Sequence, residues 1–184
     1  MYNKAELIQA LEKSFDDFAA FIVPLSPEQY ENTPSGKWSA QQQLDHLTRA
    51  VRPINFAMRL PKFLPRLLFG KPKRVGYTYD EVVQKYRSKL QAGAKASGPY
   101  IPSSSKSEKR GRALQLFEQQ KYGLLRIVEK WTENDLDTCS LPHPIIGKIT
   151  MREMLFFTIY HIQHHLKDLQ KQHEQQGRHK FAPI

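Results

Sequence analysis

Two histidines near the end of the chain have the spacing of a metal clamp. His161 and His165 are four residues apart, and residues four apart on an α-helix lie one turn apart on the same face. Both imidazoles can therefore reach one point in space. Zinc and similar divalent ions bind neutral imidazole nitrogen at about 2.0–2.1 Å, and a catalytic site commonly combines three protein ligands with an open position for water. The pair therefore predicts a metal site that needs a third ligand.

His46 is the candidate for this third ligand, because the first half of the chain contains no other histidine. His164 lies three residues after His161 and is an alternative to His165, although a supporting or surface position is also consistent with the pattern.

The zinc-protease pattern H-E-x-x-H is excluded, because Ile162 stands where it requires glutamate. The other interpretation of the pair is a core helix face. Two unpartnered imidazoles in the apolar run MLFFTIYHI would be costly to bury, which favours the metal site.

Apolar residues recur at helical spacing in the segments that must position these histidines. Ser39 and Asp80 are expected helix N-caps, and Thr150 and Glu153 have the spacing of a capping box. Pro53 is expected to kink or end its helix, since it lacks the backbone donor. The pattern predicts an all-α fold, a four-helix bundle without a convincing strand pair. The four expected bundle helices cover residues 5–22, 39–53, 105–131 and 150–169. A further helix is expected at residues 80–90.

Length and composition indicate one globular domain, 1–184, with an insertion at about 59–105 between the second and third bundle helices and a polar tail at about 174–184. The chain has 184 residues, of which 40% are hydrophobic and 25% charged, enough for a single core. Its net charge of +10 would attract phosphate, anionic lipid or an acidic substrate. Cys139 is the single cysteine, which excludes an intrachain disulfide and a Cys-rich zinc motif and favours a reducing cytoplasm.

The amino terminus lacks the pattern of a secretory signal, and no apolar run approaches the ~20 residues that cross a bilayer. The segment 59–74, RLPKFLPRLLFGKPKR, combines six basic residues with three prolines. It suits a membrane-surface or anion-binding patch, but we expect a loop or short helix that covers the bundle, with its basic groups in solvent. In that position it would shape access to the metal.

Three stretches resemble motifs of the DinB-like superfamily of metal-binding four-helix bundles. KWSAQQQLDHL, residues 37–47, resembles the beginning of the family's second helix, which carries a ligand histidine. HPIIGKITMREML, residues 143–155, resembles the beginning of its last helix, and HIQHHL, residues 161–166, resembles its paired ligand histidines. Together they span positions from about 37 to 169. Carried over to this chain, the resemblance implies three metal ligands: His46, His161 and His165.

The resemblance also implies a function: a metal-dependent enzyme with hydrolase or thiol S-transferase chemistry. Three imidazoles would leave a divalent ion, zinc or nickel, with open positions for water or a thiol. No other cofactor is expected, and the catalytic residues stay unassigned. The expected partner is a small-molecule substrate, with a low-molecular-weight thiol among the candidates, and a homodimer is a candidate assembly.

Two polar residues near the histidines are candidates for supporting roles. Arg49 lies three residues after His46 and could hold an anionic substrate, and Asp168 lies three residues after His165 and could orient that imidazole. The alternative function is a non-catalytic binding protein that uses its basic surface for nucleic acid or another anionic partner. No motif of a nucleic-acid-binding fold supports it, so the enzyme is the preferred interpretation.

Overall fold

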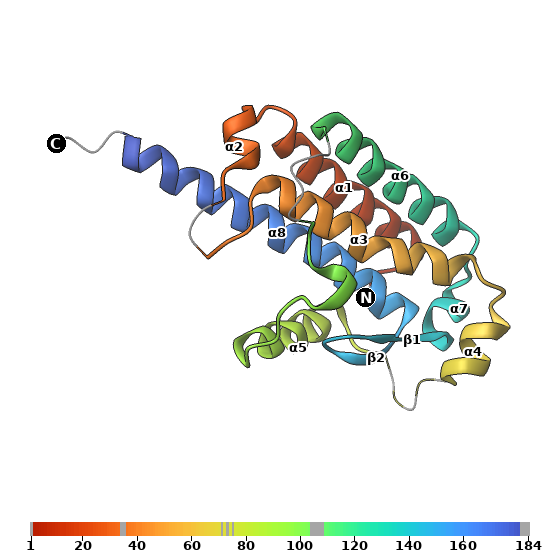
Figure 1. The fold of residues 1–184 in the computed structure, drawn as a ribbon. Coiled ribbons are helices and arrows are strands. Elements are labelled where there is room, and N and C mark those ends of the chain that lie inside the picture. Colours follow the sequence, from red (N-terminus) through yellow and green to blue (C-terminus); the bar gives the residue numbers. More distant parts are fainter. Residues whose placement is uncertain are drawn as a thin grey trace.

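Four long helices pack around one apolar core (Figure 1). In the computed structural model they are α1 (Lys4–Ile22), α3 (Ala40–Arg59), α6 (Arg110–Glu129) and α8 (Met151–Lys180). Each packs against two neighbours, in the order α1, α6, α3, α8 and back to α1. The structure describes residues 2–33, 36–70, 72, 74, 76–103 and 109–180, the side chains of 176–180 excepted. The predicted four-helix bundle is confirmed.

Aromatic rings fill the centre of the bundle between α1 and α6. The ring centroid of Phe117 lies 4.8 Å from that of Phe15 and 5.5 Å from that of Phe18, and all three side chains are buried. Tilted aromatic pairs at this separation add to the free energy of burying their apolar area. The helical spacing of Phe15 and Phe18 thus reflects the buried face of an amphipathic helix.

Capping boxes begin the two helices that carry the candidate ligands. At α3, Ser39 Oγ accepts from the Gln42 N–H at 3.2 Å, and Gln42 Oε1 accepts from the Ser39 N–H at 2.9 Å. At α8, Thr150 Oγ1 accepts from the Glu153 N–H at 3.2 Å, and Glu153 Oε2 accepts from the Thr150 N–H at 2.8 Å. Both predicted helix starts are confirmed. Each box satisfies two otherwise unpaired backbone donors.

Other predicted boundaries differ from the structure. Pro53 lies inside α3, which continues to Arg59, because the packing of α3 against α6 and α8 outweighs one missing backbone donor. Thr78, rather than Asp80, is the N-cap of the helix that follows, and its hydroxyl accepts from the Glu81 N–H at 3.3 Å. The expected helix start at Ser105 lies outside the described residues.

Between α3 and α6 the described residues form two further α-helices and a 3₁₀ turn: α4 (Phe63–Phe69), α5 (Tyr79–Gln91) and η1 (Gly98–Tyr100). α4 packs against the strand β1 (Ser140–His143), α5 against α8, and η1 against α3. The short helices α2 (Pro27–Glu31) and α7 (Glu133–Thr138) lie in other connections. α8 extends through most of the expected polar tail, while 181–184 lie outside the described residues. No helix among the described residues is long and apolar enough to cross a bilayer.

The basic segment forms α4 at the end of the bundle where α7 and β1 also lie (Figure 1). Lys62 and Arg66 form ion pairs with Asp135 of α7. Their side chains are still 37% and 36% exposed, so these two basic groups reach solvent as expected and also pair with a carboxylate. The most exposed side chains of α4 are apolar, and they are those of Phe63, Leu67 and Leu68.

A short antiparallel hairpin precedes α8. β1 (Ser140–His143) pairs with β2 (Gly147–Thr150), with Ser140 opposite Thr150 and His143 opposite Gly147. The sequence did not predict this pair, because each strand has four residues and the segment contains two prolines. Gly147 has φ +80°, a conformation that glycine adopts without strain. The hairpin places His143 beside Phe157, near the beginning of α8.

Candidate metal centre

Three histidines from two helices converge on one point. The Nε2 atom of His161 lies 3.1 Å from Nε2 of His46 and 3.1 Å from Nε2 of His165. One ring nitrogen from each residue lies within 4.8 Å of the other two. Two nitrogens bound to a tetrahedral zinc ion at about 2.0–2.1 Å are about 3.3–3.4 Å apart. The cluster therefore has the dimensions of a three-histidine divalent metal site.

Hydrogen bonds at Nδ1 determine which nitrogen of two of these rings carries the proton. His46 Nδ1 lies 2.6 Å from the backbone oxygen of Tyr100, and His165 Nδ1 lies 2.8 Å from Oε1 of Gln43. Carbonyl oxygens only accept, so each Nδ1 donates and each Nε2 keeps a lone pair. Both lone pairs face His161. A single N–H of His161 could satisfy one of them, whereas a cation satisfies all three nitrogens.

The amide of Gln43 is itself oriented by two acceptors. Its Nε2 donates to the backbone oxygen of Trp38 at 3.1 Å and to Oδ2 of Asp168 at 3.2 Å, which leaves Oε1 facing His165. Asp168 also accepts from Lys37 Nζ at 3.0 Å. Asp168 was expected to orient His165 directly. In the structure Asp168 hydrogen-bonds Gln43, and Gln43 hydrogen-bonds His165.

Burial keeps the three imidazoles in the form that binds metal. Desolvation lowers the pKa of His46, partly offset by the hydrogen bond to Tyr100. Desolvation also lowers the pKa values of His161 and His165 well below the ordinary value, and the neighbouring histidines lower both pKa values further. All three rings are neutral at pH 7, so their lone pairs are available to a cation.

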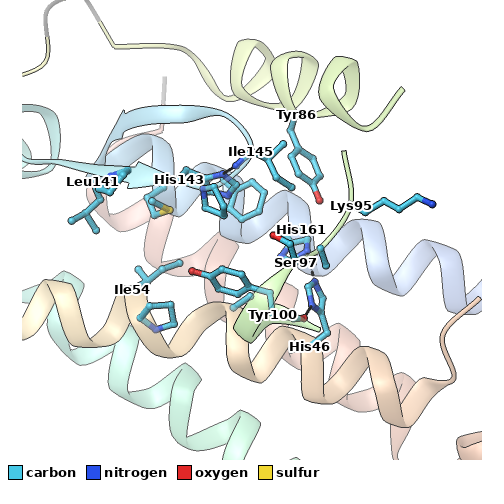
Figure 2. Close-up of a pocket in the computed structure, with 17 residues that line it drawn as sticks. His46, Ile54, Tyr86, Lys95, Ser97, Tyr100, Leu141, His143, Ile145 and His161 are labelled. Atoms are coloured by element: carbon cyan, nitrogen blue, oxygen red, sulfur yellow. Dashed lines mark hydrogen bonds between the residues drawn. The ribbon is translucent and has the colours of Figure 1, made fainter. Parts of the chain in front are cut away.

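A cavity of about 120 Å³ opens onto His46 and His161 (Figure 2). No carboxylate of a described residue lines it. Figure 2 shows the Tyr86 hydroxyl directed toward His161 and the Lys95 side chain directed away from the cavity. Burial raises the pKa of Tyr86 to about 12, so this phenol keeps its proton at pH 7. Most of the remaining wall is apolar, and its members include Ile54, Leu141, Ile145, Met154 and Phe157.

Two other residues singled out in the sequence lie outside the cluster. The ring of His164 stacks on Tyr160 at 5.9 Å between centroids, so the structure brings His165, and not His164, to the other two histidines. Arg49 Nε donates to both carboxylate oxygens of Asp45 at 2.9 Å and does not line the cavity. Its expected role in holding an anionic substrate therefore has no support in the structure.

Sequence reasoning missed three groups at this site: the Gln43 amide, the Tyr100 carbonyl and His143. Gln43 lies three residues before His46, a spacing that puts it on the same face of α3 and could have indicated a supporting role. A backbone carbonyl such as that of Tyr100 has no sequence signature. The hairpin that places His143 at the cavity was itself not predicted.

A family model described as the DinB superfamily matches residues 10–169. The chain belongs to the DinB superfamily. The match includes the three clustered histidines and residues of all four bundle helices. A search of curated proteins found no match.

Two solved structures have a fold similar to that of this chain. One is YfiT from Bacillus subtilis, which is described as a probable metal-dependent hydrolase with an unusual four-helix bundle topology. It matches with a TM-score of 0.62 and 16% identity, over 95% of this chain and 87% of YfiT. TT2238, described as a four-helix bundle protein, matches with a TM-score of 0.59 and 18% identity, covering 92% of this chain and 99% of that one.

Proposed function

We propose that this DinB-superfamily protein is a metal-dependent hydrolase in which His46, His161 and His165 bind one divalent ion. The observation that carries the proposal is the convergence of three Nε2 atoms beside an apolar cavity, with that of His161 3.1 Å from each of the others. Zinc or nickel suits three imidazole ligands. An ion bound there would act as a Lewis acid and lower the pKa of a bound water toward ~7.

The residues around the histidines support this chemistry in distinct ways. Gln43 and the Tyr100 carbonyl hold two of the rings with Nε2 toward the ion, so little reorganisation is needed when it binds. The apolar wall limits bulk water and accommodates an apolar group of a small substrate. Tyr86 is a neutral donor on the same cavity. The lone cysteine supports a cytoplasmic location as part of the proposal.

The test begins with metal content and exchange. The purified protein should contain about one divalent ion per chain, lose ester hydrolysis on chelation, and recover it on reloading with zinc, nickel, cobalt or manganese. His161→Ala should abolish stoichiometric binding. His164→Ala is the matched control, because it removes a histidine from the same helix outside the cluster, and it should retain the ion. Equal metal loss in both variants would contradict the assignment.

The same preparation separates hydrolysis from the two competing functions. Turnover that requires a low-molecular-weight thiol and produces a thioether would identify a thiol S-transferase at the same ion. Absence of turnover with every metal, together with nucleic-acid retention that falls steeply with salt, would identify a binding protein that uses its +10 charge. Metal-dependent ester hydrolysis without added thiol supports the hydrolase.

A further inference from the structure

His143 is a polar residue of the cavity wall to which neither the metal cluster nor its supporting hydrogen bonds assign a role. It ends strand β1 and is 8% exposed. Its ring contacts Phe157 at 4.2 Å between centroids, and Phe157 stacks on His161 at 4.9 Å. Figure 2 shows His143 and His161 on the same cavity, approached from the hairpin and from α8. One aromatic ring therefore separates His143 from the metal cluster.

The hairpin turn determines the tautomer of His143. Its Nδ1 accepts from the backbone N–H of Ile145 at 3.1 Å and from that of Ile146 at 3.2 Å. Because backbone N–H groups only donate, Nδ1 carries the lone pair and the ring proton is on Nε2. An added proton at Nδ1 would face both donors, and burial lowers the pKa of His143 to about 4. The ring is therefore a neutral donor at pH 7.

The Nε2–H of His143 has no hydrogen-bond partner among the described residues, although Nδ1 has two. An unpaired donor at the edge of a cavity is satisfied by water, and a ligand that displaces this water must bring an acceptor of its own. The side chains around it, Leu141 and Ile145, are apolar. A carboxylate in the cavity would be drawn to a divalent ion held by His46 and His161 rather than to this neutral donor, whereas a carbonyl oxygen at His143 needs only the one hydrogen bond.

We propose that His143 is a catalytic residue that donates its Nε2–H to the carbonyl oxygen of an uncharged ester or amide held in the cavity. The assignment rests on the proposed hydrolase function and gives it a substrate class, an uncharged carbonyl compound with a small apolar group. Hydrolysis adds one water across the acyl bond and releases an acid and an alcohol or amine. A donor preorganised toward the oxygen on which negative charge develops accelerates such a reaction by about 10²–10³-fold.

The first arm of the test observes the ring directly. In the zinc-loaded protein with ¹⁵N-labelled histidine, His143 should show a protonated Nε2 and an unprotonated Nδ1 at pH 7. Butyramide, an uncharged carbonyl probe that is not turned over rapidly, should shift the His143 Nε2–H resonance. A proton on Nδ1, or a resonance that butyramide leaves unmoved at saturation, would overturn the assignment.

The second arm separates the donor from the structural role of Nδ1. In His143→Asn the side-chain oxygen can still accept from the Ile145 and Ile146 N–H groups, but the shorter side chain withdraws the donor from the cavity. The zinc content and Tm should stay those of the parent, while kcat/KM for p-nitrophenyl butyrate falls about 10²–10³-fold. His143→Gln, whose amide reaches to the former Nε2 position, should recover at least tenfold. His164→Asn is the matched control and should keep the parental rate.

Substrate charge provides the third arm. The parent should prefer p-nitrophenyl butyrate to the anionic mono-p-nitrophenyl succinate by at least tenfold in kcat/KM. An equal rate for the two esters, or His143→Asn with parental kcat/KM, would overturn the role of His143 and leave the hydrolase standing. A loss of zinc or of Tm that accounts for the lost activity would also overturn it. If the zinc-loaded parent hydrolyses no ester, the hydrolase fails, and the butyramide shift still decides whether His143 binds a carbonyl.

Discussion

Gln43 Oε1 and His165 Nδ1 are joined by a hydrogen bond of 2.8 Å. The two residues belong to α3 and α8, so this bond connects the helix that carries His46 to the helix that carries the other two clustered histidines. The amide of Gln43 is held in turn by Trp38 and Asp168. The orientation of His165 is therefore set by α3 as well as by its own helix.

Gln43→Leu should weaken zinc binding by about 10–100-fold, the usual cost of losing a group that orients a metal ligand. The variant keeps the approximate size of the side chain but removes the acceptor for His165 Nδ1. Competition with a zinc chelator of known affinity measures the change. Gln41→Leu, two positions earlier on the same helix, is the control, and an equal loss of affinity in both variants would contradict the role of Gln43.

His46→Ala should abolish stoichiometric zinc binding, although position 46 is more than a hundred residues from the other two clustered histidines in the chain. Two remaining imidazoles cannot supply the three ligands of the proposed site. The far-ultraviolet circular dichroism spectrum of the metal-free variant should match that of the metal-free parent. Zinc retained at parental affinity would show that the third ligand is another residue.

The metal-free protein should become less stable as the pH falls from 6.5 toward 4. His143 has a folded pKa of about 4 against 6.5 when unfolded, so between these values the unfolded chain binds more protons. The stability that depends on a neutral His143 is fully present above pH 6.5. It is lost on acidification, which lowers the free energy of unfolding by about 3 kcal/mol. The clustered histidines act in the same direction. Urea unfolding in chelator should give a flatter pH profile for His143→Asn.

Asp135→Asn should lower the free energy of unfolding by about 1–2 kcal/mol without changing zinc affinity. Asp135 accepts from Lys62 and Arg66, and losing a charged acceptor costs about this much when its partners can turn to solvent. No residue of α4 lines the cavity, so the segment is not expected to control access to the metal. Urea unfolding and chelator competition measure the two effects. Reduced ester hydrolysis at parental zinc content would restore the expectation that segment 59–74 shapes access to the metal.

The bundle and the starts of α3 and α8 could be predicted from the sequence because they depend on local information. The helical spacing of Phe15 and Phe18 identifies a buried helix face. Ser39 and Thr150 mark helix starts, because each side chain accepts a hydrogen bond from the backbone N–H three residues later. The four-residue spacing of His161 and His165 likewise predicted that both side chains lie on the same face of the helix. Pro53 shows the limit of local rules, because contacts between helices kept α3 intact beyond it.

Tertiary structure alone decided which groups surround the three histidines. The carbonyl of Tyr100 reaches His46 across 54 positions of the chain, and Gln43 reaches His165 across 122, distances at which no sequence periodicity carries a signal. The hairpin that presents His143 is held by pairing between two short strands rather than by strand propensity. Residue types and spacing thus determined that a metal-binding face could form, while packing between distant segments decided the tautomers, the cavity and the donor beside it.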